Sequence, residues 1–340
     1  MTLPRDPTDD QHCDGPLLIG RVLDGQGGGR PVSWEHAQGW QSATPGEVLW
    51  LHLDRTKPEL TEWLQSELGI PEPTAELLTS DATRPRAFRD GQTLVATLRG
   101  INFNPGSDPE DMISMQLWSD GKRVVTLRRY PLQTPEDVLE EIDAGRGPND
   151  AGALITRLAE HLVIRMNAAI VDVNEEIDQL EAADPDAGQE EEQLTRIASI
   201  RRQSLALQRH MGPQHVALES ISRDAPAWFE AHDRREIGET TALLRRFLDD
   251  IDVSKESSVV LMDELRSRAL ARSEKTNRRL TLVATVFLPL SFLVGLFGIN
   301  VGGMPWAQIP GDPEGFWLVT GLCVFLGLVT VILFRRWKWL

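Results

Sequence analysis

The stretch LTLVATVFLPLSFLVGLFGIN, residues 280–300, decides the fold of this chain. Its first 18 residues, Leu280 to Phe297, contain no charged side chain. A second uncharged run of 20 residues extends from Gly315 to Phe334. The apolar core of a bilayer is about 30 Å thick and needs about 20 helical residues to cross it, so either run is long enough. The sequence therefore predicts two C-terminal transmembrane helices, 280–300 and 315–334.

Basic residues precede the first run and follow the second, and none lies between them. They are Arg272, Lys275, Arg278 and Arg279 before the first run, and Arg335, Arg336 and Lys338 after the second. The connecting loop, 301–314, contains no Lys or Arg. Positive residues are retained on the cytoplasmic side of a membrane. We therefore expect a multi-pass protein with both termini in the cytoplasm, a basic cytosolic tail at 335–340 and an external loop at 301–314.

The rest of the chain has the composition of a soluble domain. A quarter of the 340 residues are charged, and the formal net charge is −16. Such an acidic chain is a poor partner for nucleic acid, which binds surplus Lys and Arg, whereas it concentrates cations around itself. The two cysteines, Cys13 and Cys323, form no disulfide framework, which suits a reducing compartment. Alternatively, the negative net charge serves only to keep the protein soluble.

Residues 16–148 alternate between strand and helix patterns and predict a cytosolic α/β domain, after a flexible tail at 1–15. Five segments resemble strands: PLLIGRVLD, EVLWLHLD, TLVATLRGINF, MISMQLWSD and KRVVTLRR. The segment PELTEWLQSEL has helical spacing of its apolar residues. The glycine-rich GQGGGR, 25–30, lacks the Gly-Lys-Ser/Thr ending of a phosphate loop and predicts a hairpin turn.

From Asn149 onward the pattern is helical. A single apolar stripe consists of Leu158, Leu162, Met166, Ile170, Val173, Ile177 and Leu180. A break at ADPDAG, 183–188, and a second helical stripe predict an antiparallel helical hairpin over 149–225. The stalk that follows, 226–279, has neither Gly nor Pro between Gly238 and Pro289, so an unbroken helix from Glu239 to Phe297 would be roughly 90 Å long. A bundle of identical copies can support a helix of that length.

Steps of three and four residues back from Asn300 trace one face of this long helix. Its membrane part is Gly295, Ser291, Leu288, Ala284, Thr281 and Asn277. Its cytosolic part includes Glu274, Asp263, Glu256, Asp252 and Asp249. Small residues let membrane helices pack closely, and carboxylates often simply face water. Alternatively, this face surrounds a pore shared by several subunits, with acidic rings that hold cations in a cytosolic funnel.

Gly298-Ile299-Asn300, at the end of the first of two C-terminal spans, resembles the Gly-x-Asn signature of the CorA superfamily of divalent-cation transporters. Ile in place of the usual Met, followed by VGGMP (301–305) and a Lys-Trp-Leu terminus, is similar to the ZntB branch of zinc transporters. The segments LLTSDATRPRAF (77–88), GINFNPGSDPEDMISMQLW (100–118) and RVVTLRR (123–129) resemble that branch in order and spacing.

The resemblance implies a homopentamer in a bacterial inner membrane, whose α/β domains and long helices form a funnel and whose first spans line the pore. Asn300 matches the signature residue that meets the hydrated ion. The residues Gly298, Ile299, Gly295, Ser291, Leu288, Ala284, Thr281, Leu280 and Asn277 are then expected to line the pore. Asp263 falls where CorA-type proteins place an intersubunit regulatory carboxylate, which makes it a second candidate metal ligand.

The resemblance also implies zinc as the transported ion, with proton-coupled uptake described for the branch. The proposed pore face has no His or Cys, so the residues themselves do not discriminate Zn²⁺ from Mg²⁺, Co²⁺ or Ni²⁺. A magnesium, cobalt or nickel channel and a two-span receptor or scaffold without transport are the alternatives. We expect no resident cofactor and no enzymatic activity, because the sequence contains no nucleophile–base pair or cofactor fingerprint. His161, His210, His215 and His232 lack i, i+4 pairing and are expected to have ordinary packing or surface roles, with zinc binding by one of them as the alternative.

Overall fold

The computed structural model describes residues 15–108, 111–183, 190–298 and 314–336. Contacts divide the chain into two compact units, Met1–Met262 and Asp263–Leu340. The first unit is an α/β domain with long helices, and the second contains the two apolar helical segments. This arrangement confirms the predicted fold class of an N-terminal α/β domain, a very long helix and two C-terminal apolar helices.

The first unit contains a seven-stranded sheet in the order β2-β1-β3-β7-β6-β5-β4. The strands are β1 Leu17–Leu23, β2 Gly29–Pro31, β3 Val48–Asp54, β4 Arg86–Asp90, β5 Thr93–Gly100, β6 Ile113–Ser119 and β7 Arg123–Arg128. The pairing of β3 with β7 is parallel, and each of the other neighbouring pairs is antiparallel. The five strands expected from the sequence are confirmed, whereas β2 and β4 were not predicted because they are short edge strands with mostly polar residues.

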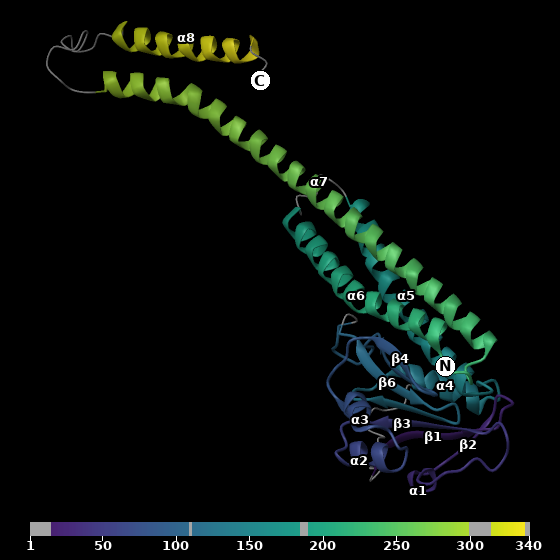
Figure 1. Ribbon diagram of the computed structural model, residues 1–340. Helices are drawn as coiled ribbons and strands as arrows, with labels where there is room; N and C mark the ends of the chain where they lie inside the picture. The colour runs from purple at the N-terminus through teal and green to yellow at the C-terminus, as the bar shows by residue number, and fades with distance from the viewer. Residues whose placement is uncertain (1–14, 109–110, 184–189, 299–313, 337–340) are drawn as a thin grey trace. The chain divides into compact units, whose positions relative to one another are not determined.

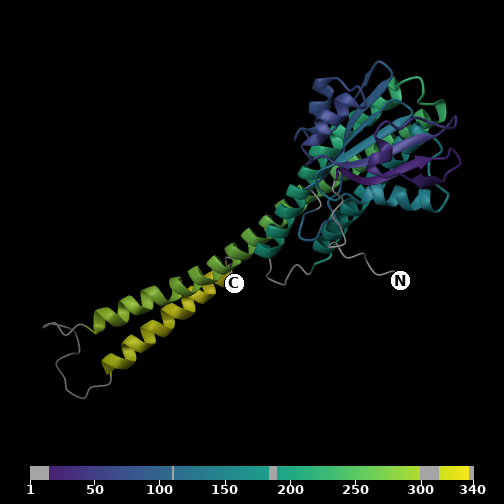
Figure 2. The same ribbon diagram turned by 90° about the horizontal axis from the view of Figure 1, so that it is seen from below.

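Helices cover both faces of this sheet (Figures 1 and 2). One face packs against the short helices α1 Trp34–Ala37, α2 Glu59–Ser66 and α3 Glu72–Thr79. The other face packs against α4 Gln133–Asp143, α5 Ala151–Glu181, α6 Glu190–Asp224 and the first part of α7 Ala231–Phe297. Because successive strand residues point to opposite faces, Leu94 and Ala96 of β5 join the second core while Val95 joins the first.

The predicted hairpin turn at residues 25–30 is confirmed, since β1 and β2 pair in antiparallel fashion across it. Gly25 and Gly27 have φ values of 74° and 90°, in a region that residues with a Cβ rarely adopt. Asp24 stabilises the turn, because its Oδ1 accepts hydrogen bonds from Gln26 N at 2.7 Å and Gly28 N at 3.0 Å.

The long helices follow the apolar stripes of the sequence. All seven stripe residues predicted for α5 are buried, and α6 buries Ile197, Ile200, Leu207 and Met211. Helix α7 contains 67 residues, which corresponds to about 100 Å at 1.5 Å per residue. It begins at Ala231 rather than at Glu239, because Asp233 Oδ2 accepts a hydrogen bond from Glu230 N at 2.9 Å and caps the first turn. Gly238 therefore lies inside the helix.

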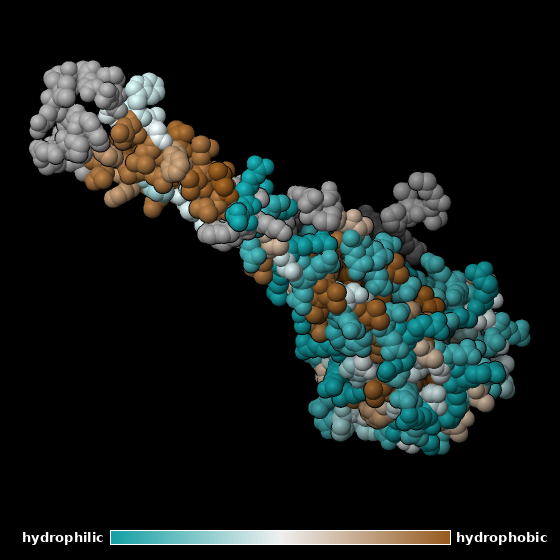
Figure 3. All heavy atoms as spheres, turned by 90° about the horizontal axis from the view of Figure 1, so that it is seen from above, coloured by the Kyte–Doolittle hydropathy of each residue, from teal (hydrophilic) through white to brown (hydrophobic). Residues whose placement is uncertain are grey.

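The second unit consists of α7 from Asp263 onward and α8 Glu314–Arg336. The apolar windows in both helices are long enough to cross a membrane, and none of their residues is buried within the chain. Large apolar side chains such as Leu288, Phe292 and Phe325 are more than 60% exposed. Figure 3 shows this part of the surface as hydrophobic, in contrast to the hydrophilic surface of the α/β domain. A solvent-exposed apolar surface of this extent requires lipid or other chains around it.

His52 of β3 is fully buried and makes the α/β domain sensitive to acid. Its Nδ1 lies 2.9 Å from Thr126 Oγ1, and its Nε2 has no hydrogen-bond partner among the described residues. Burial, followed by the charge of Arg128, lowers the pKa of His52 to about 3. The folded state therefore keeps His52 neutral at a pH where the unfolded chain takes up a proton.

We expect the urea midpoint of unfolding to fall between pH 7.5 and pH 5.5 and to fall less in His52→Leu. The stability due to neutral His52 is complete above the unfolded pKa of about 6.5 and is lost as the pH falls toward about 3, at about 1.4 kcal/mol per pH unit. The measurement is urea unfolding of the detergent-solubilised full chain at both pH values. An equal decrease in the wild type and in His52→Leu would contradict the prediction.

Candidate functional site

Helix α7 has two distinct faces within the α/β unit. One face packs into the domain and buries residues at steps of three and four: Leu244, Leu248, Ile251, Ser254, Ser258 and Leu261. The opposite face carries four carboxylates expected from the sequence to form an acidic funnel, Asp249, Asp252, Glu256 and Asp263, and all four residues are exposed. The chain's own fold therefore leaves the acidic face of this helix uncovered.

Basic and amide side chains contact three of these carboxylates, which the sequence analysis did not anticipate. Arg245 Nε lies 3.2 Å from Asp249 Oδ1, and Arg266 Nη1 lies 4.0 Å from Asp263 Oδ1. Such exposed pairs on one helix contribute little stability and are easily exchanged. In the single chain, this face therefore carries both acidic and basic side chains, and the basic ones partly neutralise its negative charge.

Asp252 has the closest polar contacts of the group. Its Oδ1 accepts hydrogen bonds from Lys255 Nζ at 2.9 Å and from Gln208 Nε2 of α6 at 2.8 Å. The hydrogen bond from Lys255 is the main reason that the pKa of Asp252 is lowered. This carboxylate is therefore ionised at neutral pH and held between two helices.

The second unit contains the residues that the sequence analysis placed on the apolar part of the stripe. Glu274, Asn277, Thr281, Ala284, Leu288, Ser291 and Gly295 are all exposed, as is Leu280. The half-exposed residues of the same segment, Leu282, Val286, Leu290, Leu293 and Phe297, recur on the opposite face. Partial burial thus falls on one side of the segment, and the small and hydroxylated residues lie on the other.

The polar groups of this apolar segment differ in whether their own helix satisfies them. The hydroxyl of Thr281 donates to Asn277 O at 2.9 Å, so this polar group is satisfied within its own helix. Pro289 has no N–H to donate to the carbonyl of Thr285, one turn earlier. That carbonyl oxygen is therefore available to water or to another chain.

Gly298 directly follows the last residue of α7, and its N–H donates to Val294 O at 2.9 Å. The remaining two residues of the signature, Ile299 and Asn300, lie outside the described residues, as does the loop that follows. Their role as the outer mouth of a pore stays a prediction.

The four histidines singled out in the sequence lie away from this stripe. His161 Nε2 is 3.0 Å from Glu141 Oε1 of α4, and His210 Nε2 is 3.4 Å from Arg99 Nη1 of β5. Burial, and then the charge of Arg99, lowers the pKa of His210 to about 4, so it is neutral at physiological pH. These contacts are structural ones between α4, α5, α6 and the sheet.

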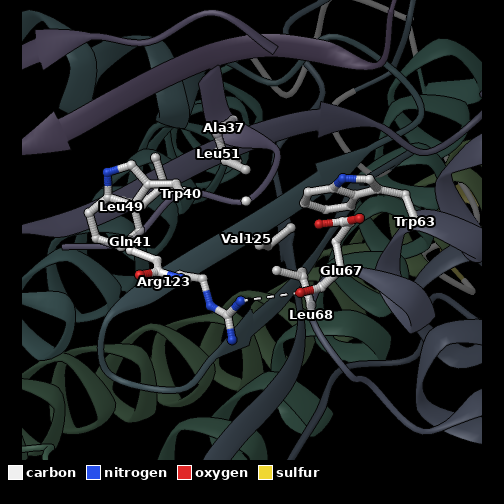
Figure 4. Close-up of a pocket in the computed structure, with 11 residues that line it drawn as sticks. Ala37, Trp40, Gln41, Leu49, Leu51, Trp63, Glu67, Leu68, Arg123 and Val125 are labelled. Carbon is white, nitrogen blue, oxygen red and sulfur yellow. Dashed lines mark hydrogen bonds between the residues drawn. The ribbon is translucent and has the colours of Figure 1, made fainter. Parts of the chain in front are cut away.

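A small cavity of about 200 Å³ lies between the sheet and α2 (Figure 4). Apolar side chains dominate its lining, among them Trp40, Trp63 and Val125. Arg123 Nη1 donates to the main-chain oxygen of Glu67 at 3.5 Å across one side. The cavity opens to the surface of the α/β domain, where its lining residues Gly39 and Gln41 are exposed, and it shares no residue with the stripe of α7.

The family of CorA-like Mg²⁺ transporter proteins matches residues 45–336 of the chain. The divalent cation transporter CmaX of Pseudomonas aeruginosa is 37% identical over 331 residues, which cover 95% of this chain and 97% of that protein. The zinc transport protein ZntB of Yersinia enterocolitica is 32% identical over 328 residues, with 94% of each chain covered.

Solved structures agree with the sequence comparison. The full-length CmaX structure has a TM-score of 0.80 and 36% identity, and it covers 95% of this chain and 98% of its own. The CorA magnesium transporter of Methanocaldococcus jannaschii has a TM-score of 0.78 at 18% identity, which shows a shared fold. The family is one of membrane transporters, in agreement with the expectation that the chain is not an enzyme. The chain therefore belongs to the CorA superfamily, in its ZntB-like branch.

Proposed function

We propose that this chain is one subunit of a homopentameric zinc transporter of the bacterial inner membrane, with both termini in the cytoplasm. The single observation that carries the proposal is the uncovered stripe of α7. It begins with exposed carboxylates at Asp249 and Asp252 and continues through small and hydroxylated residues to Gly295. Five copies of such a stripe, arranged around an axis, would form an acidic funnel that leads into a pore. The domain boundaries predicted from the sequence, including the stalk at 226–279, are part of this proposal.

An oligomer is required because one chain cannot enclose a water-filled path with two helices. Leu288, at 74% exposed, is the bulkiest residue on the membrane part of the stripe. A ring of this side chain would form an apolar constriction, while Ala284, Ser291 and Gly295 leave room for water above and below it. The acidic residues would hold cations near the cytosolic entrance.

Similarity to proteins named for zinc and divalent-cation transport supports zinc as the ion. The stripe offers oxygen atoms and no imidazole or thiolate, so it does not build a dehydrated tetrahedral zinc site. The carbonyl oxygen of Asn300 would instead accept hydrogen bonds from the water shell of a hydrated ion. The proposed transport therefore moves zinc in at least a partly hydrated form.

The proposal is tested by reconstituting the purified oligomer in liposomes that contain a zinc-sensitive dye. A zinc-dependent signal above that of empty vesicles is the expected result. Parallel runs with Mg²⁺, Co²⁺ and Ni²⁺ distinguish zinc transport from a broader channel, and an imposed pH gradient tests proton coupling. Absence of any ion-dependent signal from a correctly assembled oligomer would favour a receptor or scaffold.

The face of α7 that lines the path is tested by Ser291→Cys in a background that also carries Cys13→Ser and Cys323→Ser. A positively charged thiol reagent should reduce zinc flux about tenfold or more, because a fixed cation in a narrow path repels the next cation. The matched control is Leu293→Cys, on the opposite, half-exposed face. Flux is measured in liposomes before and after modification. Equal inhibition of both variants would argue against this orientation of the helix.

A further inference from the structure

The first turns of α5 and α7 bring together three potential metal ligands that are far apart in the sequence. Asp150, His232 and Asp233 each offer a ligand atom, and these atoms lie within 4.8 Å of one another. All three belong to the α/β unit, where Asp150 caps α5 and where His232 and Asp233 lie in the first turn of α7, and none of them is a residue of the stripe. The cluster is therefore distinct from the proposed transport path.

Each of the two carboxylates caps the backbone at the start of a helix with one of its oxygens. Asp150 Oδ1 accepts from Ala153 N at 2.8 Å as the N-cap of α5, and Asp233 Oδ2 accepts from Glu230 N at 2.9 Å. The other oxygen of Asp233, Oδ1, is buried and has no hydrogen-bond donor among the described residues. Helix capping therefore accounts for only one of the two oxygens of Asp233.

The buried oxygen of Asp233 points toward the imidazole of its neighbour. His232 Nε2 lies 3.1 Å from Asp233 Oδ1, which is near the separation of about 3.3 Å between two ligand atoms of a tetrahedral zinc ion. The Asp233 side chain has no exposed surface, whereas that of His232 is 44% exposed. One ligand is thus fixed in the core, and another is free to turn toward an arriving ion.

Glu230 lies on the other side of the imidazole. Its Oε2 is 3.5 Å from His232 Nδ1. When a cation lies between Nε2 and Asp233, a carboxylate at this position would accept the Nδ1 proton and leave Nε2 as the electron-pair donor to the metal. Histidines that bind metals commonly have such a partner on their second ring nitrogen.

Without a cation, the two carboxylates crowd each other. Asp150 and Asp233 each bring a carboxylate oxygen to the cluster, within 4.8 Å of the other. Gly152 permits this approach, because a Cβ at that position would lie 2.1 Å from Asp233 Oδ2. The positive ends of the α5 and α7 dipoles oppose a cation, but by only about 0.3–1 kcal/mol each. Two carboxylates outweigh that effect.

We propose that Asp150, His232 and Asp233 form a binding site for a first-row divalent transition metal of the Zn²⁺ type. Two carboxylate oxygens and one imidazole nitrogen suit Zn²⁺, Co²⁺ or Ni²⁺, whereas Mg²⁺ prefers oxygen ligands alone. The exposed side of His232 leaves a fourth position to water. A small inward rotation of the side chains would close the ligand set around the ion.

The site is tested by titrating the detergent-solubilised full chain with Co²⁺, whose visible absorption is strong in tetrahedral sites and weak for hydrated, octahedral ions. We expect an intense band that saturates at one equivalent per chain. His232→Gln should weaken Co²⁺ binding at least tenfold. Asp150→Asn should do the same while it preserves the helix cap. His215→Gln, which changes a histidine of α6 outside the cluster, is the matched control and should retain the band.

No intense band in the folded wild type, or equal affinity in the wild type and His232→Gln, would overturn the proposal. Zinc flux in liposomes is measured separately on the same preparations. A wild-type oligomer that shows the Co²⁺ band but transports no zinc would refute the proposed function and support the metal site. A wild-type oligomer that transports zinc but shows no band would refute the metal site and support the proposed function.

Discussion

Leu288→Arg is expected to reduce zinc flux about a thousandfold or more. Leu288 lies on the uncovered stripe of α7, where five copies would surround the path. A divalent cation about 5 Å from one guanidinium is repelled by about 1.7 kcal/mol even at the dielectric constant of water. Several such charges raise the barrier by about 4 kcal/mol or more, which corresponds to three orders of magnitude in rate. The measurement is initial zinc influx into dye-loaded liposomes.

The matched control for this variant is Leu288→Gln, which has a neutral side chain of similar size. It should retain substantial flux, because it removes the apolar contact without adding a charge. Size-exclusion chromatography establishes that both variants assemble as the wild type does. An assembled Leu288→Arg oligomer with normal flux would place Leu288 outside the path.

Trp50→Ala is expected to destabilise the α/β domain by about 3–5 kcal/mol. Trp50 is fully buried in β3, within the larger of the two cores. Its Nε1 donates a hydrogen bond to Thr126 Oγ1 of β7 at 3.1 Å. The substitution removes a large side chain from a close-packed core and also removes a donor in the interior. Urea unfolding of the solubilised chain, followed by circular dichroism, measures the loss.

Two further variants separate the cavity from the hydrogen bond. Trp50→Phe keeps most of the ring volume and should cost about 1–2 kcal/mol, chiefly through the lost hydrogen bond. Tyr130→Ala changes an aromatic residue that is 56% exposed and should cost about 1 kcal/mol or less. A loss below about 1 kcal/mol in Trp50→Ala would mean that the core around β3 collapses to fill the space.

The contacts of the acidic face bear on how the proposed funnel would respond to ions. Asp252 is held by Lys255 and Gln208, whereas Asp263 lies 4.0 Å from Arg266, a longer and weaker pairing. An arriving cation therefore competes with a side chain that is already present at either carboxylate. Exposed pairs of this kind contribute little free energy, so they offer only weak competition to a cation.

The sequence by itself determined two apolar helices long enough to cross a membrane and the buried face of α5. An uncharged run of about 20 residues is sufficient to predict a transmembrane helix. Lipid cannot solvate a charged side chain, and a helix forms the hydrogen bonds of its own backbone. The steps of three and four residues from Leu158 to Leu180 were sufficient for α5, since a helix repeats every 3.6 residues. These are local properties that neighbouring residues in the chain specify.

Only the tertiary structure decided which distant segments meet. The parallel pairing of β3 with β7 joins residues more than 70 positions apart, and nothing in either strand specifies that partner. The same holds for Asp150, which reaches His232 and Asp233 only because α5 and α7 begin side by side in the folded domain. Which face of α7 is covered was likewise decided by packing, since Leu244 and Ile251 contribute to a core built from many segments. Contacts of this kind depend on the free energy of the whole fold, which no local pattern encodes.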